Sequence, residues 1–209
     1  AMWASVRSRL QPNSAGSRSF LNWIVNKMNS LAPPPLTPSD GVGVIYSFGR
    51  GNHFQLGLND ADDRAVPSYA RSFQASIVSL ACGEAHSALV LNTGRVLTFG
   101  WNESGQCGQD EEADYAWQEL EQPYPQELAT VSQLHIVQVA CGARHTALLS
   151  AEGDVLCFGN NALGALGNGT EVNHNVPMPV AALRGKKVTQ IAASGDVTAA
   201  VTDSGEVCL

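Results

Sequence analysis

The stretch IVSLACGEAHSALVL at residues 77–91, followed by TGRVLTFG at residues 93–100, decides the fold because the chain repeats it. Shifted by 59 residues it reads IVQVACGARHTALL at 136–149 and EGDVLCFG at 152–159. A weaker copy follows as TQIAA at 189–193, TAAV at 198–201 and SGEVC at 204–208. Self-similarity at a period near 50 indicates a row of equivalent modules, which constrains the fold more than any single residue does.

Each repeat contains the same order of short, turn-bounded apolar segments. One segment ends at Cys-Gly, a second starts at His-Ser/Thr-Ala-Leu, and a third follows a glycine turn and ends in Phe-Gly. A glycine-rich loop and a proline-marked segment come last, and proline suits an outer edge strand because it lacks a backbone donor. No helical period is sustained within the repeats. Four strands per unit of about fifty residues predict an all-β fold, with four-stranded β-propeller blades over residues 42–209.

The same landmarks resemble the regulator of chromosome condensation repeat. The matching elements are Ala-Cys-Gly to His at 81–86 and 140–145, the runs from glycine to Phe-Gly at 94–100 and 153–159, and the loops Gly-Gln-Cys-Gly at 105–108 and Gln-Leu-Gly at 55–57. There is no Gly-Gly doublet of the kelch type and no Trp-Asp dipeptide of the WD type. The resemblance implies a propeller that normally has seven blades.

The chain contains fewer strands than such a ring requires. It enters at a third strand near Val44–Phe48 and leaves at another third strand near Glu206–Leu209, so we expect about three blades, as in a partial propeller or a fragment. An open arc leaves two mostly apolar blade faces uncovered. We therefore expect further blades or another chain to cover them.

The first forty residues differ in composition from the repeats. Residues 1–39 contain four cations and no acidic residue, and many serines, whereas the whole chain carries a formal charge of −7. We expect residues 1–40 to form a basic Ser/Pro-rich arm with a helix over about 20–31, ended by Pro33-Pro34-Pro35. Such an arm suits docking on the propeller, binding of a partner, or organelle targeting. Four cations make too small a phosphate-binding footprint to favour nucleic acid.

Cysteine usage and hydropathy indicate the compartment. Five cysteines lie on or beside repeat strands, and an odd number spread over a large core favours reduced thiols. No stretch reaches the ~18–20 apolar residues that a membrane span needs. We expect an intracellular protein, cytoplasmic or nuclear, or mitochondrial if the basic arm is a presequence.

The histidines and glycines that recur in the repeats have structural explanations. His86 and His145 each follow a Cys-Gly and could suggest zinc, but equivalent positions in neighbouring blades are too far apart to share an ion. We expect them to hold a strand turn by hydrogen bonds. Neither a phosphate-binding loop nor a dinucleotide fingerprint is present. The sequence predicts no catalytic, cofactor-binding or metal site, and no enzyme activity.

One insertion departs from the repeat pattern between Gly108 and Pro123. Exposed aromatic residues among charges are common anchors of protein interfaces, and an acidic loop steers basic partners. A solvated connector without a role is the alternative. The predicted contact residues of the insertion are Asp110, Glu111, Glu112, Asp114, Tyr115, Trp117 and Glu119, and Trp101 and Arg144 are weaker candidates for the same surface.

Three functions fit these observations. The first is a non-enzymatic protein-interaction scaffold, because every regular position has a structural role and the irregular insertion is acidic and aromatic. The second, which the family resemblance implies, is guanine-nucleotide exchange on a Ran-like small GTPase. The third is a structural subunit of a large assembly.

Overall fold

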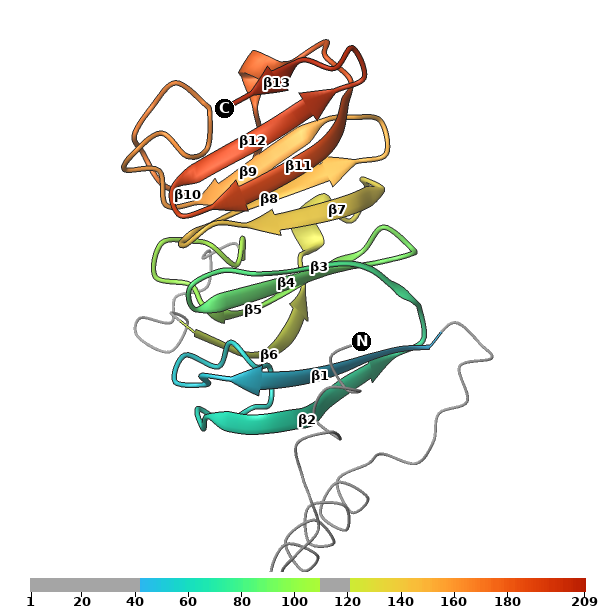
Figure 1. Cartoon of the computed structure of the whole chain (residues 1–209), viewed down its shortest axis with the longest axis vertical. Coiled ribbons are helices and arrows are strands. Elements are labelled where there is room, and N and C mark those ends of the chain that lie inside the picture. The colour runs from blue at the N-terminus through green and yellow to red at the C-terminus, as the bar shows by residue number, and fades with distance from the viewer. Residues whose placement is uncertain (1–41, 110–120) are drawn as a thin grey trace, which may run out of the picture. The chain divides into compact units, whose positions relative to one another are not determined.

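The computed structural model describes residues 42–109 and 121–209 (Figure 1). Within these residues the secondary structure is almost entirely β, with two short 3₁₀ helices, η2 (Ala129–Val131) and η3 (Ala181–Leu183). The strands are β1 (Gly43–Gly49), β2 (Arg64–Phe73), β3 (Ile77–Cys82), β4 (His86–Leu91), β5 (Val96–Trp101), β6 (Glu121–Glu127), β7 (Ile136–Cys141), β8 (His145–Ser150), β9 (Val155–Gly159), β10 (His174–Pro179), β11 (Val188–Ser194), β12 (Val197–Thr202) and β13 (Val207–Cys208).

These strands form four antiparallel sheets that follow one another in chain order (Figure 1). We call them the first blade (β1–β2), the second blade (β3–β6), the third blade (β7–β10) and the fourth blade (β11–β13). The second and third blades have four strands each, in simple meander order. The first contains only the third and fourth strands of the pattern and the fourth contains only the first three. The predicted all-β partial propeller is therefore confirmed, including its entry and exit at third strands.

The position of each strand in its blade explains its residue types. The second strands β4 and β8 are buried along their whole length, because neighbouring blades cover both of their faces, and they are mainly apolar after the initial His-Ser or His-Thr. The fourth strands β2, β6 and β10 contain the prolines and lie at the sheet edges, as predicted. β12 corresponds to β4 and β8 but is half exposed, since one face of the fourth blade has no neighbour.

The hydrophobic core is divided into three layers, one at each junction between blades. The layer between the second and third blades includes Val96, Leu128, Ile136 and Phe158. A second layer joins the third blade to the fourth, and a third joins the first to the second. Each blade therefore depends on its neighbours to bury apolar surface, as expected for a repeat architecture.

Polar side chains connect successive blades across the same junctions. His86 Nε2 lies 2.9 Å from the hydroxyl oxygen of Thr146, and His145 Nε2 lies 2.8 Å from that of Thr198. Each threonine hydroxyl in turn donates to a loop carbonyl of the preceding blade. The predicted hydrogen bonding by these histidines is therefore found, but it joins two blades rather than closing one strand turn.

Other predictions concern cysteines, membrane spans and the N-terminal arm. All five cysteines are free, as predicted. Residues 42–109 and 121–209 include no helix with the length and hydropathy needed to cross a bilayer. The arm at 1–40 and its predicted helix over 20–31 lie outside the described residues, so that domain division stays a prediction.

Candidate protein-interaction face

Each blade presents two kinds of connection at opposite ends of its strands. We call the end formed by residues 50–64, 83–85, 102–109, 121, 142–144, 160–173 and 195–196 the loop face; it joins first to second and third to fourth strands. We call the end formed by residues 71–76, 92–95, 127–135, 151–154, 180–187 and 202–206 the turn face. On the loop face the connections between third and fourth strands are long, whereas those between first and second strands are tight, as are the connections within blades on the turn face.

Backbone hydrogen bonds hold the loop face together across blades. The amide of Glu84 donates to the carbonyl of Ala143 at 3.1 Å, and the amide of Ala143 donates to the carbonyl of Gly195 at 2.7 Å. The amide of Trp101 donates to Ala85 at 2.8 Å, which places the end of β5 beside the loop between β3 and β4. Loops from neighbouring blades are thus held in fixed positions relative to one another.

An aromatic and cationic cluster lies on this face at the end of β5. The indole of Trp101 stacks on the imidazole of His53, with ring centroids 5.1 Å apart and planes inclined by 22°. The guanidinium carbon of Arg144 lies 4.8 Å from the centre of the Trp101 ring, which is a cation–π contact. His53 comes from the first blade, Trp101 from the second and Arg144 from the third, so one side chain connects three blades.

Two carboxylates flank this cluster. The Nδ1 atom of His53 lies 2.8 Å from Oε1 of Glu121, the first residue of β6. The Nε atom of Arg144 lies 3.4 Å from Oε2 of Glu84. The His53–Glu121 hydrogen bond is half-buried and the Arg144–Glu84 ion pair is exposed, so both contribute little to stability. They orient the imidazole and the guanidinium around the indole. We call Glu84, Trp101, Glu121, Arg144 and His53 the tryptophan cluster.

The residues of the tryptophan cluster are not those that the repeat requires. The position of Trp101 in the second blade is occupied by Arg50 in the first and Asn160 in the third. The position of Arg144 is occupied by Ala85 and Asp196 in the neighbouring blades. The fold therefore accepts very different side chains at these positions. Their choice here is free to serve another role, such as contact with a partner.

Charge is distributed very unequally between the two ends of the blades. The turn face is balanced, with five cations and five carboxylates among the described residues: Arg71, Arg95, Arg184, Lys186, Lys187, Glu127, Glu152, Asp154, Asp203 and Glu206. The described part of the loop face contains eight carboxylates and only three cations: Asp60, Asp62, Asp63, Glu84, Glu103, Glu121, Glu171, Asp196, Arg50, Arg64 and Arg144. The insertion at 110–120 adds five carboxylates between β5 and β6. The acidic character of the repeats is thus confined to one end.

The structure places only part of the predicted site. Trp101 and Arg144 were predicted for one surface, and they are in direct contact. Asp110, Glu111, Glu112, Asp114, Tyr115, Trp117 and Glu119 lie outside the described residues, so their role stays a prediction. The sequence analysis missed His53, Glu84 and Glu121. His53 could have been found by comparing equivalent positions, because Ser104 and Leu163 take its place in the other two repeats.

The histidines of the repeat are buried and are engaged in hydrogen bonds between blades. Burial lowers the pKa of His86 to about 4, and it also lowers that of His145, although the Asp196 carboxylate opposes the shift. The Nε2–H of each imidazole donates to a threonine. In the described part of the chain, no three His, Cys, Asp or Glu side chains are grouped as metal ligands would be.

Comparison with known proteins identifies the repeat. The sequence profile described as the regulator of chromosome condensation (RCC1) repeat matches residues 43–90, 93–149 and 152–201, and a second profile with this description matches 77–106 and 136–165. The ultraviolet-B receptor UVR8 of Arabidopsis thaliana is 33% identical over 166 residues, which cover 78% of this chain and 36% of the receptor. The mitochondrial RCC1 domain-containing protein RUG3 of the same plant is 30% identical over 172 residues, 79% of this chain and 37% of that protein.

Human proteins and solved structures agree with these matches. The probable E3 ubiquitin-protein ligase HERC3 of Homo sapiens is 34% identical over 156 residues, 74% of this chain but 14% of the ligase. Prp20p from Saccharomyces cerevisiae superimposes with a TM-score of 0.66 at 22% identity, covering 78% of this chain and 41% of that one. Human WBSCR16 superimposes with a TM-score of 0.65 at 23% identity, covering 84% of this chain and 48% of that one. This chain therefore spans less than half the length of each of these proteins.

Proposed function

This chain belongs to the regulator of chromosome condensation (RCC1) repeat family, and from that premise we propose that it is a non-enzymatic protein-interaction module whose loop face binds a basic segment of a partner protein. The observation that carries the proposal is the confinement of the net negative charge to the loop face. A surface of one sign attracts partners of the opposite sign and raises their rate of association.

The tryptophan cluster gives this face a rigid centre. Trp and Arg are the residue types most often found at the energetic centre of protein interfaces, because they offer large contact area and several donors. Trp101 is held by contacts from the two adjoining blades, so little conformational entropy is lost when a partner covers it. We propose that Trp101 and Arg144 contact the partner together with the insertion residues Asp110, Glu111, Glu112, Asp114, Tyr115, Trp117 and Glu119.

A charge-neutralising pair of variants tests the acidic surface. The loop-face variant combines Glu103→Gln, Glu171→Gln and Asp196→Asn, three exposed residues outside the observed ion pairs. The matched turn-face control combines Glu152→Gln, Asp154→Asn and Asp203→Asn, which removes the same charge from the other end. Binding of a fluorescent Lys/Arg-rich peptide is measured by anisotropy at about 50 and 200 mM salt. We expect Kd to rise about fivefold or more for the loop-face variant alone. Equal effects of the two variants would refute the acidic loop face as the binding surface.

Deletion of residues 110–120 tests the insertion separately. The same peptide is titrated against the deletion variant and against Trp101→Ala. We expect both changes to weaken binding, the deletion through charge and the substitution through lost contact area. If neither changes Kd, the insertion and the tryptophan cluster have no part in recognition.

Nucleotide exchange is the second candidate function. The study of Prp20p describes its binding to Gsp1p and histones, and that protein shares the fold of this chain at a TM-score of 0.66. A scaffold of rigid loops can bind a GTPase and distort its nucleotide site without bond-making chemistry. Release of a fluorescent GDP analogue from a Ran-type GTPase measures this directly. A rate unchanged by an excess of this chain removes exchange as a function.

A further inference from the structure

The side chain of Arg144 occupies a place on the loop face that has the chemistry of a binding site for a basic side chain. Its guanidinium carbon lies 4.8 Å from the centre of the Trp101 ring, and its Nε atom lies 3.4 Å from Oε2 of Glu84. An aromatic face beside a carboxylate attracts a cation through the ring quadrupole and through charge. The structure therefore shows this place filled by a cation of the chain's own third blade.

Glu84 and Trp101 form the fixed half of the site. Both belong to the second blade, and the amide of Trp101 donates to the carbonyl of Ala85, the residue after Glu84, at 2.8 Å. The imidazole of His53 stacks on the indole from the first blade, the opposite neighbour to the one that supplies Arg144. Neither contact involves Arg144. The ring and the carboxylate should therefore keep their positions when its guanidinium is absent.

The side chain of Arg144 is held weakly. The Arg144 and Glu84 side chains are 44% and 57% exposed, and a single exposed ion pair contributes little to stability. The Nε–Oε2 distance of 3.4 Å also exceeds the about 2.7–2.9 Å that is typical of a charge-assisted hydrogen bond. The backbone is held more firmly, because the carbonyl of Arg144 accepts from the amide of Asn160 at 2.8 Å. The guanidinium can therefore leave the ring while its loop stays in place.

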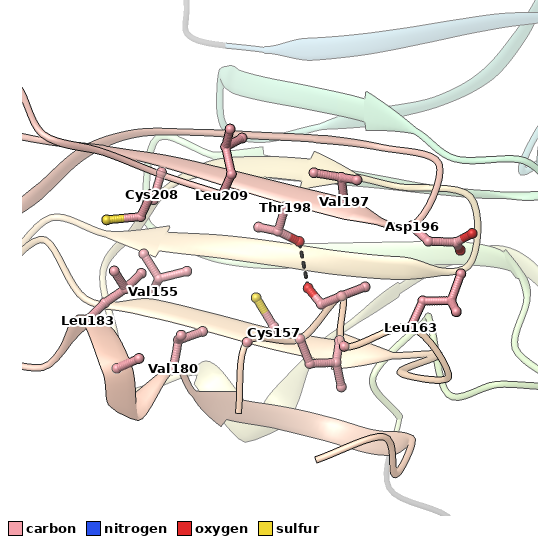
Figure 2. Close-up of a pocket in the computed structure, with 16 residues that line it drawn as sticks. Val155, Cys157, Leu163, Val180, Leu183, Asp196, Val197, Thr198, Cys208 and Leu209 are labelled. Carbon is pink, nitrogen blue, oxygen red and sulfur yellow. Dashed lines mark hydrogen bonds between the residues drawn. The ribbon is translucent and has the colours of Figure 1, made fainter. Parts of the chain in front are cut away.

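The repeat does not require this combination of side chains. At the next junction Ala143, Asn160 and Asp196 occupy the positions of Glu84, Trp101 and Arg144. Figure 2 shows Asp196 beside a pocket of about 350 Å³, which is lined by aliphatic side chains such as those of Leu163 and Val197. None of the described residues that line this pocket is aromatic. The pairing of an aromatic face with a carboxylate is thus a feature of the second blade, not of the repeat.

We propose that the site formed by Glu84 and Trp101 binds an arginine side chain of the basic partner segment, and that Arg144 occupies it in the free chain as a competitor. The inference rests on the proposed function and adds the chemical group that is recognised. Arginine suits the site better than lysine does, because a planar guanidinium stacks on a ring while its N–H groups reach a carboxylate, whereas an ammonium is a compact, strongly hydrated point charge. When the partner binds, Arg144 leaves the ring and stays at the edge of the covered surface, since its backbone is fixed.

Two fluorescent peptides of equal length and charge test the site, one with arginine and the other with lysine as its cations. Their Kd values are measured by anisotropy at about 50 mM salt. Arg144→Gln removes the competitor. Arg50→Gln is the matched control, because Arg50 is an exposed cation of the same face outside the tryptophan cluster. We expect Arg144→Gln to lower Kd for the arginine peptide about two- to fivefold more than the control does, and to lower Kd for the lysine peptide less.

A Trp101→Ala background shows whether this gain depends on the indole. Without the ring there is no site to vacate, so Arg144→Gln should then lower Kd no more than Arg50→Gln does in the same background. Circular dichroism confirms that each variant is folded, and the repeat already accepts alanine or aspartate at the position of Arg144. A gain from Arg144→Gln that persists without the indole overturns the proposal.

The remaining outcomes separate this inference from the proposed function. If Arg144→Gln binds no more tightly than Arg50→Gln, while binding still depends on the loop-face carboxylates Glu103, Glu171 and Asp196, Arg144 is not a competitor and only this inference is overturned. An equal gain for the two peptides overturns the selection of arginine. If neither peptide binds the parent chain or the Arg144→Gln variant, the proposed function and this inference are both wrong.

Discussion

The imidazole of His86 donates a hydrogen bond from Nε2 to the hydroxyl oxygen of Thr146, 2.9 Å away in the next blade. The direction follows from the other partner, because the Thr146 hydroxyl itself donates to the carbonyl of Gln106 at 2.8 Å. Nε2 of His86 therefore carries a proton, and because burial lowers the pKa of the imidazole to about 4, His86 is neutral at pH 7. His145, Thr198 and Ala165 repeat the arrangement at the following junction.

Removing the hydroxyl of Thr146 should destabilise this junction. Thr146→Val keeps the shape of the side chain but leaves the His86 donor and the Gln106 carbonyl buried and unpaired. We expect a loss of about 2–4 kcal/mol in the free energy of unfolding, measured by urea denaturation. Thr146→Ser retains the hydroxyl and serves as control. Equal stability of the two variants would show that the hydrogen-bonded chain contributes nothing.

Stability should fall as pH decreases from about 6.5 to about 4. Burial lowers the pKa of His86 to about 4, so within this window the unfolded chain binds a proton that the folded chain does not. Above pH 6.5 His86 is neutral in both the folded and the unfolded chain, so the free energy of unfolding does not depend on its titration. Between pH 6.5 and pH 4 the free energy of unfolding falls by up to about 3 kcal/mol. His86→Gln retains an N–H donor but cannot titrate. We expect the free energy of unfolding of this variant, measured in urea, to change less with pH. A pH dependence equal to that of the parent chain would contradict the assignment to His86.

Glycine at position 108 should be required for close approach of the blades. Its φ is +70°, and a Cβ would lie 2.7 Å from the ring of Phe158. Gly169 has a similar φ of +78° with nothing within 4 Å, so Gly169→Ala measures the backbone cost alone. We expect Gly108→Ala to be less stable than this control by about 1–3 kcal/mol in urea unfolding. An equal loss of unfolding free energy in the two variants would mean that the Phe158 ring moves away from the added methyl group without an energetic cost.

Four of the five cysteines should react with alkylating agents in two groups. Burial raises the pKa of Cys107, and it raises the pKa values of Cys141 and Cys157 to about 12. These thiols are protonated and inaccessible, whereas Cys82 is exposed. In a time course of iodoacetamide labelling followed by peptide mass spectrometry, Cys82 should react first. The three buried thiols should react only when the protein unfolds, and rapid labelling of Cys141 would show that the junction opens readily.

Much of the fold could be predicted because the repeat carries it in local patterns. The start of β4 at His86 and of β8 at His145, the Phe-Gly strand ends and the proline-bearing edge strands depend on neighbouring residues in the chain. The order of these landmarks, repeated with a period near 50 residues, predicts four-stranded propeller blades. The candidate site was harder to predict. Trp101 and Arg144 were predicted as weaker candidates for one surface, but the contacts of Trp101 with Arg144 and with His53 were not predicted.

The sequence by itself determined that equivalent β modules stand side by side and that their first three strands are bounded at Cys-Gly, at His and at Phe-Gly, because strand period and turn chemistry are local properties. Only the tertiary structure decided which side chains meet between modules. His86 meets a threonine 60 positions later, and His53 lies against a carboxylate 68 positions later. It also decided that the net negative charge of the repeats lies at one end of the blades. Such pairings depend on how the twisted sheets stack, and no property of either chain segment alone specifies them.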